Sequence, residues 1–225
     1  MTDKTAIQIN SELSEPRKTN KKDDAQRDFT FIHINKNAGC SIEDALGLKK
    51  AHKTAQVARE QIGSEQWQNQ FTFSFVRNPW DRVVSRYFFA KKVIEVEKKV
   101  DPSYADVSSF EAFLGERHKW GSENYMWHRA VRGWYPAFDH VIDDDSNVRC
   151  DIIRFEHLDE DLCSYFNLPM MSRKRNVTAL NKGSYKDIYT KETIQIVADW
   201  YKKDIEYWGF NFDTSANINY WKQKQ

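Results

Sequence analysis

Cysteine is scarce in this sequence, which has only Cys40, Cys150 and Cys163 among its 225 residues. The number is odd and no pair has Cys-x-x-Cys spacing, so the pattern favours neither a disulfide framework nor a zinc site. We therefore expect a protein that holds no metal ion and is not cross-linked by disulfides.

Long apolar runs are missing as well. No window approaches the roughly 18 uncharged apolar residues that a membrane-spanning helix needs. The start of the sequence also lacks the apolar run of a secretory signal. These absences predict a soluble, cytoplasmic protein that does not span a membrane.

An excess of either charge is absent too. The 34 Lys and Arg residues are balanced by 33 Asp and Glu residues, which leaves a net charge of +1. A broad electrostatic grip on nucleic acid requires a marked basic excess, so we do not expect nucleic acid as a partner. Any anion that this protein binds must be held by a local arrangement of groups.

Hydrophobic residues are sparse at the start of the chain and frequent after it. Residues 1–28 contain six of them and no aromatic residue, against 40% hydrophobic residues in the whole sequence. Such a segment cannot bury enough apolar surface to fold, which predicts a disordered tail. The remaining length, 29–225, suits a single domain with one hydrophobic core.

Short apolar runs alternate with helical patterns along the rest of the chain. Strands are predicted at 29–34, 71–76, 140–142 and 151–155. Helices are predicted from near Ser41, from Pro79 to about Lys92, over Leu158, Leu162 and Phe166, and from near Thr190 to Trp208. Strand-loop-helix units in series predict a three-layer α/β fold, in which helices flank a central parallel sheet. Such sheets bind ligands at the carboxyl ends of their strands.

Residues 35–41, Asn-Lys-Asn-Ala-Gly-Cys-Ser, lie at the carboxyl end of the first predicted strand. Small residues, backbone N–H groups and one lysine at the start of a helix favour anion binding. The loop is not a Walker A loop, in which the lysine directly precedes the hydroxyl residue, because Lys36 precedes Ser41 by five residues. A magnesium-dependent kinase is therefore disfavoured. The alternative to anion binding is an ordinary strand-to-helix turn.

A second loop follows the strand predicted at 71–76. It begins with Arg77-Asn78-Pro79, in which Asn is a good N-cap and Pro a good first helical residue. With Arg82, Ser85 and Tyr87 it forms the pattern Arg-Asn-Pro-x-x-Arg-x-x-Ser-x-Tyr. Together with 34–41, this pattern closely resembles the two nucleotide-binding motifs of the sulfotransferases that use 3′-phosphoadenosine-5′-phosphosulfate (PAPS). The resemblance extends over about residues 29 to 212 and is closest to the carbohydrate branch.

The resemblance implies the P-loop-like sulfotransferase fold for 29–225, PAPS as sulfuryl donor, no metal, and a glycan as acceptor. It implies that Lys36 stabilises the leaving 5′-phosphate and that Arg77 and Ser85 bind the 3′-phosphate. Further donor contacts are implied for Asn37, Ala38, Gly39, Cys40 and Ser41 in the first loop, and for Lys182 and Gly183 in a late turn. The sequence departs from the family where Asn35 replaces a common proline and where Cys40 replaces another small residue. At Cys40 a side chain small enough for phosphate to approach the backbone is favoured over a reactive thiol.

The chemistry of PAPS supports this assignment, since a 3′-phosphate and a 5′-phosphosulfate need two separate anion sites and the sequence supplies two. A hydroxyl acceptor also needs a general base. The resemblance implies His52 in this role, and Glu43, Asp44, His118 and His128 remain alternatives. His33 is expected to pack or to support the loop.

Three other matters stay open at this point. The aromatic stretch from Trp120 to Tyr135 either lines an acceptor cleft or packs in the core. An amine acceptor is the second choice after a hydroxyl, and the oligomeric state is undetermined. The rival functions are a non-catalytic nucleotide-binding domain and a P-loop-type kinase.

Overall fold

The structure is a computed structural model that describes residues 29–48, 52–99, 101–118, 133–158, 161, 183–213 and 220–221. Two compact units make up the chain. The first, called the sheet unit below, comprises Met1–Val76, Ala137–Asn176 and Ile218–Gln225. The second, the helical unit, comprises Arg77–Pro136 and Val177–Asn217. The predicted disordered tail, 1–28, lies outside the described residues, and the single domain stays a prediction.

The sheet unit is built on strands β1 (Phe29–Ile32), β2 (Phe71–Val76), β3 (Asp151–Arg154) and β4 (Tyr220–Trp221), in that spatial order. β1 pairs with β2 and β2 with β3 in parallel, whereas β4 pairs antiparallel with β3. The register sets Phe31 beside Phe73 and Phe75 beside Ile153. The predicted parallel sheet is confirmed, with an antiparallel edge strand that the sequence did not indicate.

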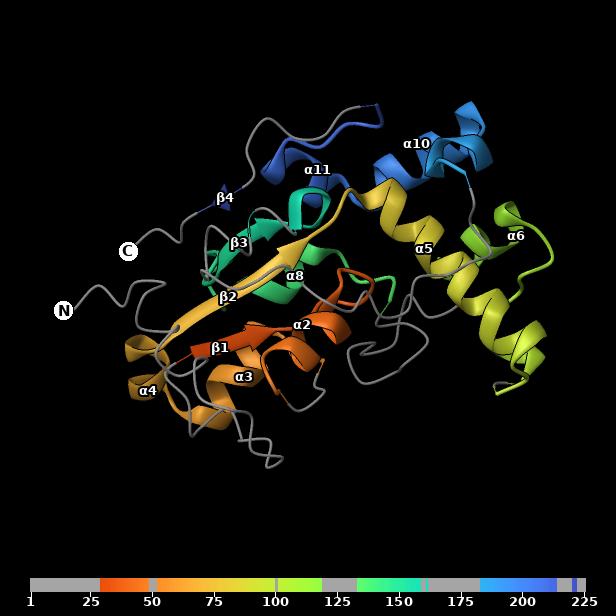
Figure 1. The fold of residues 1–225 in the computed structure, drawn as a ribbon. Coiled ribbons are helices and arrows are strands. Elements are labelled where there is room, and N and C mark those ends of the chain that lie inside the picture. The colour runs from red at the N-terminus through yellow and green to blue at the C-terminus, as the bar shows by residue number, and fades with distance from the viewer. Residues whose placement is uncertain are drawn as a thin grey trace. The chain divides into compact units, whose positions relative to one another are not determined.

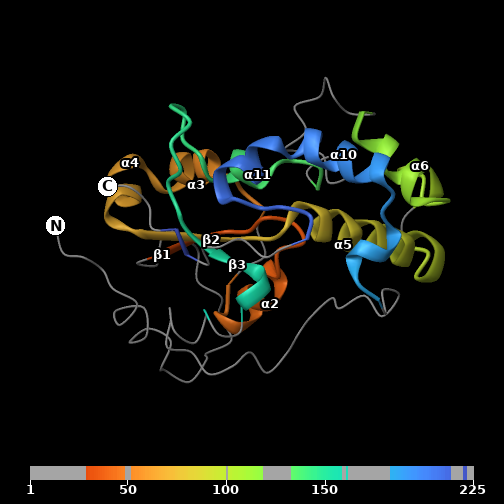
Figure 2. The ribbon, with the colours of Figure 1, turned by 90° about the horizontal axis from the view of Figure 1, so that it is seen from above.

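Helices cover both faces of this sheet. Side chains alternate between the two faces of a strand, and the odd-numbered ones here face α2 (Gly39–Ala45). The core between them contains Phe29, Ile42, Leu48, Phe73, Phe75, Ile153 and Leu158. Figure 2 shows α3 (Ala55–Ile62) and α4 (Ser64–Asn69) on the side of the strands opposite to α2. The three-layer α/β arrangement is therefore confirmed in this unit.

The helical unit is built around α5 (Pro79–Lys91), which continues as a π-helix over Lys92–Val96 (Figure 1). Asn78 caps α5, because its side chain accepts a hydrogen bond from the backbone N–H of Trp80 at 3.1 Å. Pro79 is the first helical residue, as predicted. The other helices are α6 (Phe110–Gly115), α10 (Lys191–Trp200), α11 (Lys202–Trp208) and 3₁₀ turns at Pro102–Tyr104, Glu116–His118 and Tyr185–Ile188.

Two arginines of α5 make contacts within the helical unit that stabilise its packing. Arg82 is 1% exposed and donates a hydrogen bond to the carbonyl of Tyr135 at 2.9 Å. Arg86 lies over the ring of Trp134, with 4.9 Å between the guanidinium carbon and the ring centre. Burial lowers the pKa of Arg86 to about 10. Arg82 of the motif and its neighbour Arg86 therefore serve packing within this unit.

Two element predictions were wrong. The strand predicted at 140–142 is instead the end of helix α8 (Ala137–Val141), followed by a single bridge from Ile142 to Val148. An apolar run of three residues does not distinguish a strand from a buried helix segment. The last helix divides into α10 and α11 at Tyr201, whose backbone leaves the helical region. Its predicted end at Gly209 is confirmed, with a left-handed φ of 65°.

The remaining elements of the sheet unit include the 3₁₀ turn Phe155–His157 after β3. The predicted helix over Leu158, Leu162 and Phe166 lies largely outside the described residues.

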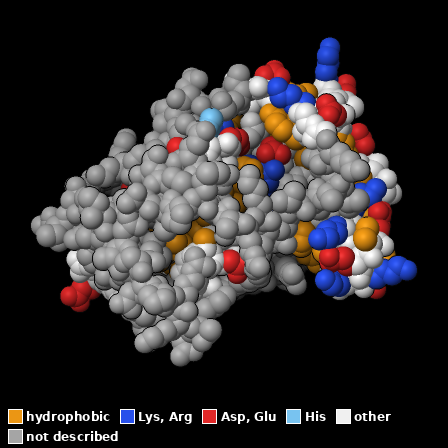
Figure 3. All heavy atoms as spheres, viewed as in Figure 1, with side chains coloured by type: hydrophobic (Ala, Val, Ile, Leu, Met, Phe, Trp, Pro, Cys, Tyr) orange, Lys and Arg blue, Asp and Glu red, His pale blue; other side chains and the backbone are white. Residues whose placement is uncertain are grey.

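No helix in the described ranges has the length and apolar character that crossing a bilayer requires. On the face shown in Figure 3, basic and acidic side chains lie interspersed over the described surface of the helical unit.

Candidate functional site

The loop between β1 and α2 reverses direction through two left-handed residues. Lys36 has φ 69° and Ala38 has φ 61°, a region that residues with a Cβ seldom occupy. Ala38 is the N-cap of α2, and its carbonyl accepts from the N–H groups of Ser41 and Ile42 at 2.8 and 3.2 Å. Backbone strain of this kind persists at ligand clamps because the surrounding structure enforces it. Helix α2 begins at Gly39, two residues earlier than predicted.

One side chain fastens this loop to the neighbouring strand. Asn37 is 1% exposed, and its Nδ2 donates a hydrogen bond of 2.6 Å to the carbonyl of Phe75 in β2. This amide is therefore occupied by the fold, and the backbone N–H of Asn37 donates a hydrogen bond of 3.4 Å to the carbonyl of Ile34 within the turn. Lys36 and Cys40 are half-buried at the two ends of the turn. The loop thus places one lysine beside the N-terminus of α2, whose helix dipole favours a negative charge.

A cluster of titratable side chains lies beside the loop. His33 follows β1 on the face that packs against α2, and its Nδ1 is 2.8 Å from Oε1 of Glu43, a hydrogen bond. The ring of His52 lies against that of His33, with 4.0 Å between the ring centres. His33 is 3% and Glu43 1% exposed. Two candidates for the general base, His52 and Glu43, therefore flank a single imidazole ring.

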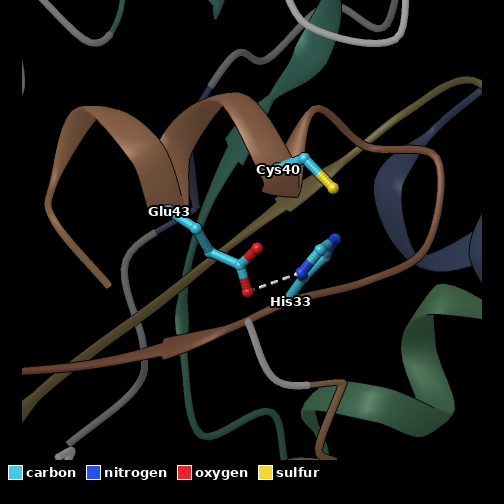
Figure 4. Close-up of side chains that lie close together, drawn as sticks. All are labelled: His33, Cys40 and Glu43. Carbon is cyan, nitrogen blue, oxygen red and sulfur yellow. Dashed lines mark hydrogen bonds and ion pairs between the residues drawn. The ribbon is translucent and has the colours of Figure 1, made fainter. Parts of the chain in front are cut away.

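Cys40 belongs to the same cluster. Figure 4 shows Cys40 and Glu43 reaching from α2 toward the ring of His33, which comes from the strand side. Cys40 and Glu43 are three residues apart on a helix and so share one face. One ligand atom of each, with a nitrogen of His33, lies within 4.8 Å of the others. The sequence predicted that His33 packs or supports the loop, and its contacts with Glu43 and His52 agree with a packed position.

The close approach of α2 to His33 requires glycine at position 39. A Cβ there would lie 2.0 Å from Cδ2 and 2.1 Å from Nε2 of His33, distances that side chains do not adopt. The ring cannot yield, since Glu43 holds it from the other side. We expect Gly39→Ala to lower the free energy of unfolding by about 1–3 kcal/mol, the usual cost of overpacking. Urea denaturation measures this loss.

Gly115→Ala is the matched control for that substitution. Gly115 ends α6, and a Cβ there meets no atom within 4 Å. The control should leave stability unchanged or raise it slightly, since alanine favours the helix. Equal stability of both variants would show that His33 moves freely and would contradict the rigid cluster.

The second predicted loop lies in the helical unit. Arg77 directly follows the last residue of β2 in the chain, and its guanidinium donates two hydrogen bonds to Asp81, from Nε at 2.7 Å and from Nη2 at 2.9 Å. Asp81 and Ser85 are four residues apart in α5 and lie on one face. Asp81 therefore fixes the direction of the Arg77 side chain, and Ser85 is half-buried one helical turn beyond Asp81. The sequence did not predict this pair.

The other predicted residues are placed as follows. Asp44 is half-buried on α2. His118 is exposed at the end of a 3₁₀ turn, and its ring stands edge-to-face with that of Trp200, with 5.7 Å between the ring centres. Gly183 is exposed before the turn Tyr185–Ile188. Lys182 and His128 lie outside the described residues, as does most of the aromatic stretch predicted near the acceptor.

Each unit by itself offers groups that suit an anion. The sheet unit has an ammonium group at a helix N-terminus with an imidazole cluster beside it, and the helical unit has an oriented guanidinium and a hydroxyl. A model of the sulfotransferase family matches residues 23–211 of the sequence. Neither the curated proteins nor the solved structures contain a significant match.

Proposed function

The chain belongs to the sulfotransferase family, and on this premise we propose that it transfers a sulfuryl group from PAPS to a hydroxyl group of a carbohydrate. The observation that carries the proposal is the loop 35–41, in which Lys36 and the start of α2 form one anion-binding turn fastened to the sheet. The groups along this turn fit a phosphosulfate, because each can donate a hydrogen bond to an anionic oxygen.

PAPS supplies the sulfuryl group and a 5′-phosphate as leaving group. The Lys36 ammonium group stabilises the charge that develops on the oxygen bridging sulfur and phosphorus. The backbone N–H groups of Gly39 and Cys40 and the Ser41 hydroxyl bind the 5′-phosphate. Sulfuryl transfer moves less charge than phosphoryl transfer, so these donors suffice for the reaction that we propose.

His52 is the general base in this proposal. It accepts the proton of the acceptor hydroxyl while the oxygen forms its bond to sulfur and the bond from sulfur to the 5′-phosphate oxygen breaks. The packing of His52 against His33 at 4.0 Å supports this role, because His33 is itself fixed by Glu43 and so limits the orientations of the base. His33 and Glu43 are positioning residues in this mechanism.

The choice of a glycan hydroxyl as acceptor rests on the likeness of the two loops to the carbohydrate branch of the family. An amine remains the second choice, since a base that deprotonates a hydroxyl also serves an amine nucleophile. Turnover with a panel of glycans and with an aminated analogue, each at equal concentration, separates these acceptors.

The donor is tested by thermal unfolding with adenosine 3′,5′-bisphosphate (PAP), the desulfated product of PAPS. At 100 times its dissociation constant, PAP should stabilise the protein by about 2.7 kcal/mol, which raises the melting temperature by roughly 5 to 10 °C. ATP lacks the 3′-phosphate and should raise it much less. An equal shift with ATP would contradict PAPS as the donor and favour a kinase. A PAP shift without turnover on any acceptor would favour the non-catalytic nucleotide-binding domain.

Arg77 and Ser85 bind the 3′-phosphate in this proposal. The Asp81 carboxylate supports it, because it holds the Arg77 fork in a fixed direction on the face of α5 to which Ser85 also belongs by its spacing. We expect Arg77→Ala to weaken PAP binding by about 2 kcal/mol, roughly 30-fold, the loss of a charge-assisted phosphate contact. Isothermal titration calorimetry measures this affinity.

Arg59→Ala is the control for the change in charge. Arg59 is a half-exposed residue of α3 whose contact with Asp144 is long, at 3.9 Å. Its removal should leave PAP affinity unchanged. Unaltered PAP affinity in Arg77→Ala would rule out this residue as the ligand of the 3′-phosphate.

A further inference from the structure

We propose that His33, Cys40 and Glu43 form a binding site for one thiophilic divalent cation, with Zn²⁺ as the ion whose ligand preferences they match. Zinc takes thiolate sulfur, imidazole nitrogen and carboxylate oxygen, and this cluster supplies one of each. The cysteine spacing did not indicate this site, because its ligands do not include a Cys-x-x-Cys pair.

The spacing of the ligand atoms suits a zinc ion. In a tetrahedral site with bonds of about 2.0 to 2.3 Å, neighbouring ligand atoms lie about 3.3 to 3.8 Å apart. The three atoms here lie within 4.8 Å of one another. Closing this difference needs a shift of about 1 Å, which rotation of the Cys40 and Glu43 side chains on their shared helix face can supply. Three protein ligands leave a fourth position for water.

The fold holds the imidazole of His33 ready for a metal. Its Nδ1 lies 2.8 Å from Oε1 of Glu43, whereas its Nε2 edge packs against the backbone at Gly39, so Nδ1 is the nitrogen that can share an ion with Glu43. The ion takes the place of the proton that Nδ1 and Glu43 share, and Cys40 reaches toward the same ring from the first turn of α2 (Figure 4). Because His33 is 3% exposed and bonded to Glu43, the ligand set needs little ordering when the metal arrives.

Charge and softness favour zinc over magnesium. A thiolate and a carboxylate together neutralise a divalent cation, which matters for groups as buried as Glu43, 1% exposed. A thiolate selects zinc, whereas magnesium prefers oxygen ligands and keeps its water. Binding releases the Cys40 thiol proton, so the apparent affinity rises with pH.

A metal in this position would affect sulfuryl transfer, and this consequence rests on the proposed function. The ion occupies His33 and Glu43, which position His52, and it engages Cys40 in the loop assigned to the 5′-phosphate. Bound zinc therefore inhibits turnover, and EDTA restores it.

Cobalt titration tests the site directly. Metal-free protein, kept reduced with a phosphine, is titrated with Co²⁺ and followed by absorption spectroscopy. One equivalent should produce a sulfur-to-cobalt charge-transfer band and the visible bands of tetrahedral cobalt, and Zn²⁺ should displace both. Cys40→Ser should abolish the charge-transfer band and weaken zinc binding by more than about 100-fold, the upper range for loss of an outer partner.

Cys163→Ser is the matched control, since it also removes one thiol, and it should retain the band. Glu43→Gln should bind zinc more weakly than the wild type. A missing charge-transfer band in the wild type, or a band that persists in Cys40→Ser, would overturn the proposal. The spectrum does not depend on activity, so a failed titration with an intact PAP melting shift contradicts the metal site alone. A cobalt charge-transfer band in a protein that PAP does not stabilise contradicts PAPS binding alone.

Discussion

His52→Ala should lower the turnover number by about 10²- to 10⁴-fold, the range for loss of a general base. In the wild type, activity should rise with pH as the general base loses its proton. Activity rises with pH, and does not fall, because only neutral imidazole can take the proton from the hydroxyl of the acceptor. The variant should lack this rise. Initial rates over a pH series, with saturating PAPS, measure both effects.

PAP affinity should be unchanged in His52→Ala, because the base does not touch the product nucleotide in our proposal. His118→Ala is the control, since it removes an exposed imidazole and should keep wild-type turnover. Full turnover in His52→Ala would move the role to Glu43, Asp44, His118 or His128. Substitution of each of these residues would then identify the base.

Lys36→Ala should lower the turnover number by about 10²- to 10³-fold, as expected when a donor to developing charge is removed. The loss of PAP affinity should be much smaller, because the contact strengthens as the leaving oxygen gains charge in the transition state. Single-turnover kinetics and calorimetry, on the same preparation, separate the two effects.

Lys36→Met keeps the length of the side chain and removes its charge. It should lower the turnover number as much as Lys36→Ala does, which would show that the ammonium charge causes the effect. Lys99→Ala removes a lysine that is 69% exposed and pairs with Glu97, and it should have no effect. If Lys36→Ala weakened PAP binding strongly and kept its turnover number, Lys36 would be a binding residue with no part in the chemical step.

The loops and the parallel strands could be predicted because their signals are local. Strand β2 and the start of α5 agree with the prediction to the residue, since an apolar run meets Asn78-Pro79, a cap followed by a first helical residue. The lysine loop was equally visible, because its small residues stand between a strand and a helix. Such features depend on residues that are neighbours in sequence.

The cluster around His33 could not be predicted in the same way. Its members come from the end of β1, from the first turns of α2 and from the segment before α3, and tertiary packing brings them together. Glu43 appeared as a possible base, whereas the structure makes it the partner of His33. The break at Tyr201 was hidden for a related reason, since its side chain fits the periodic apolar face of one long helix.

The hydrogen bond from Asn37 to β2 has a thermodynamic consequence. It fixes the middle of the lysine loop when the sheet forms, so the loss of chain entropy in this segment occurs during folding. A nucleotide that binds the loop then has little of this cost to offset, and more of the contact energy is expressed as affinity. Because Phe75 accepts the bond through its main chain, many side chains at position 75 preserve it, whereas a change at position 37 removes it.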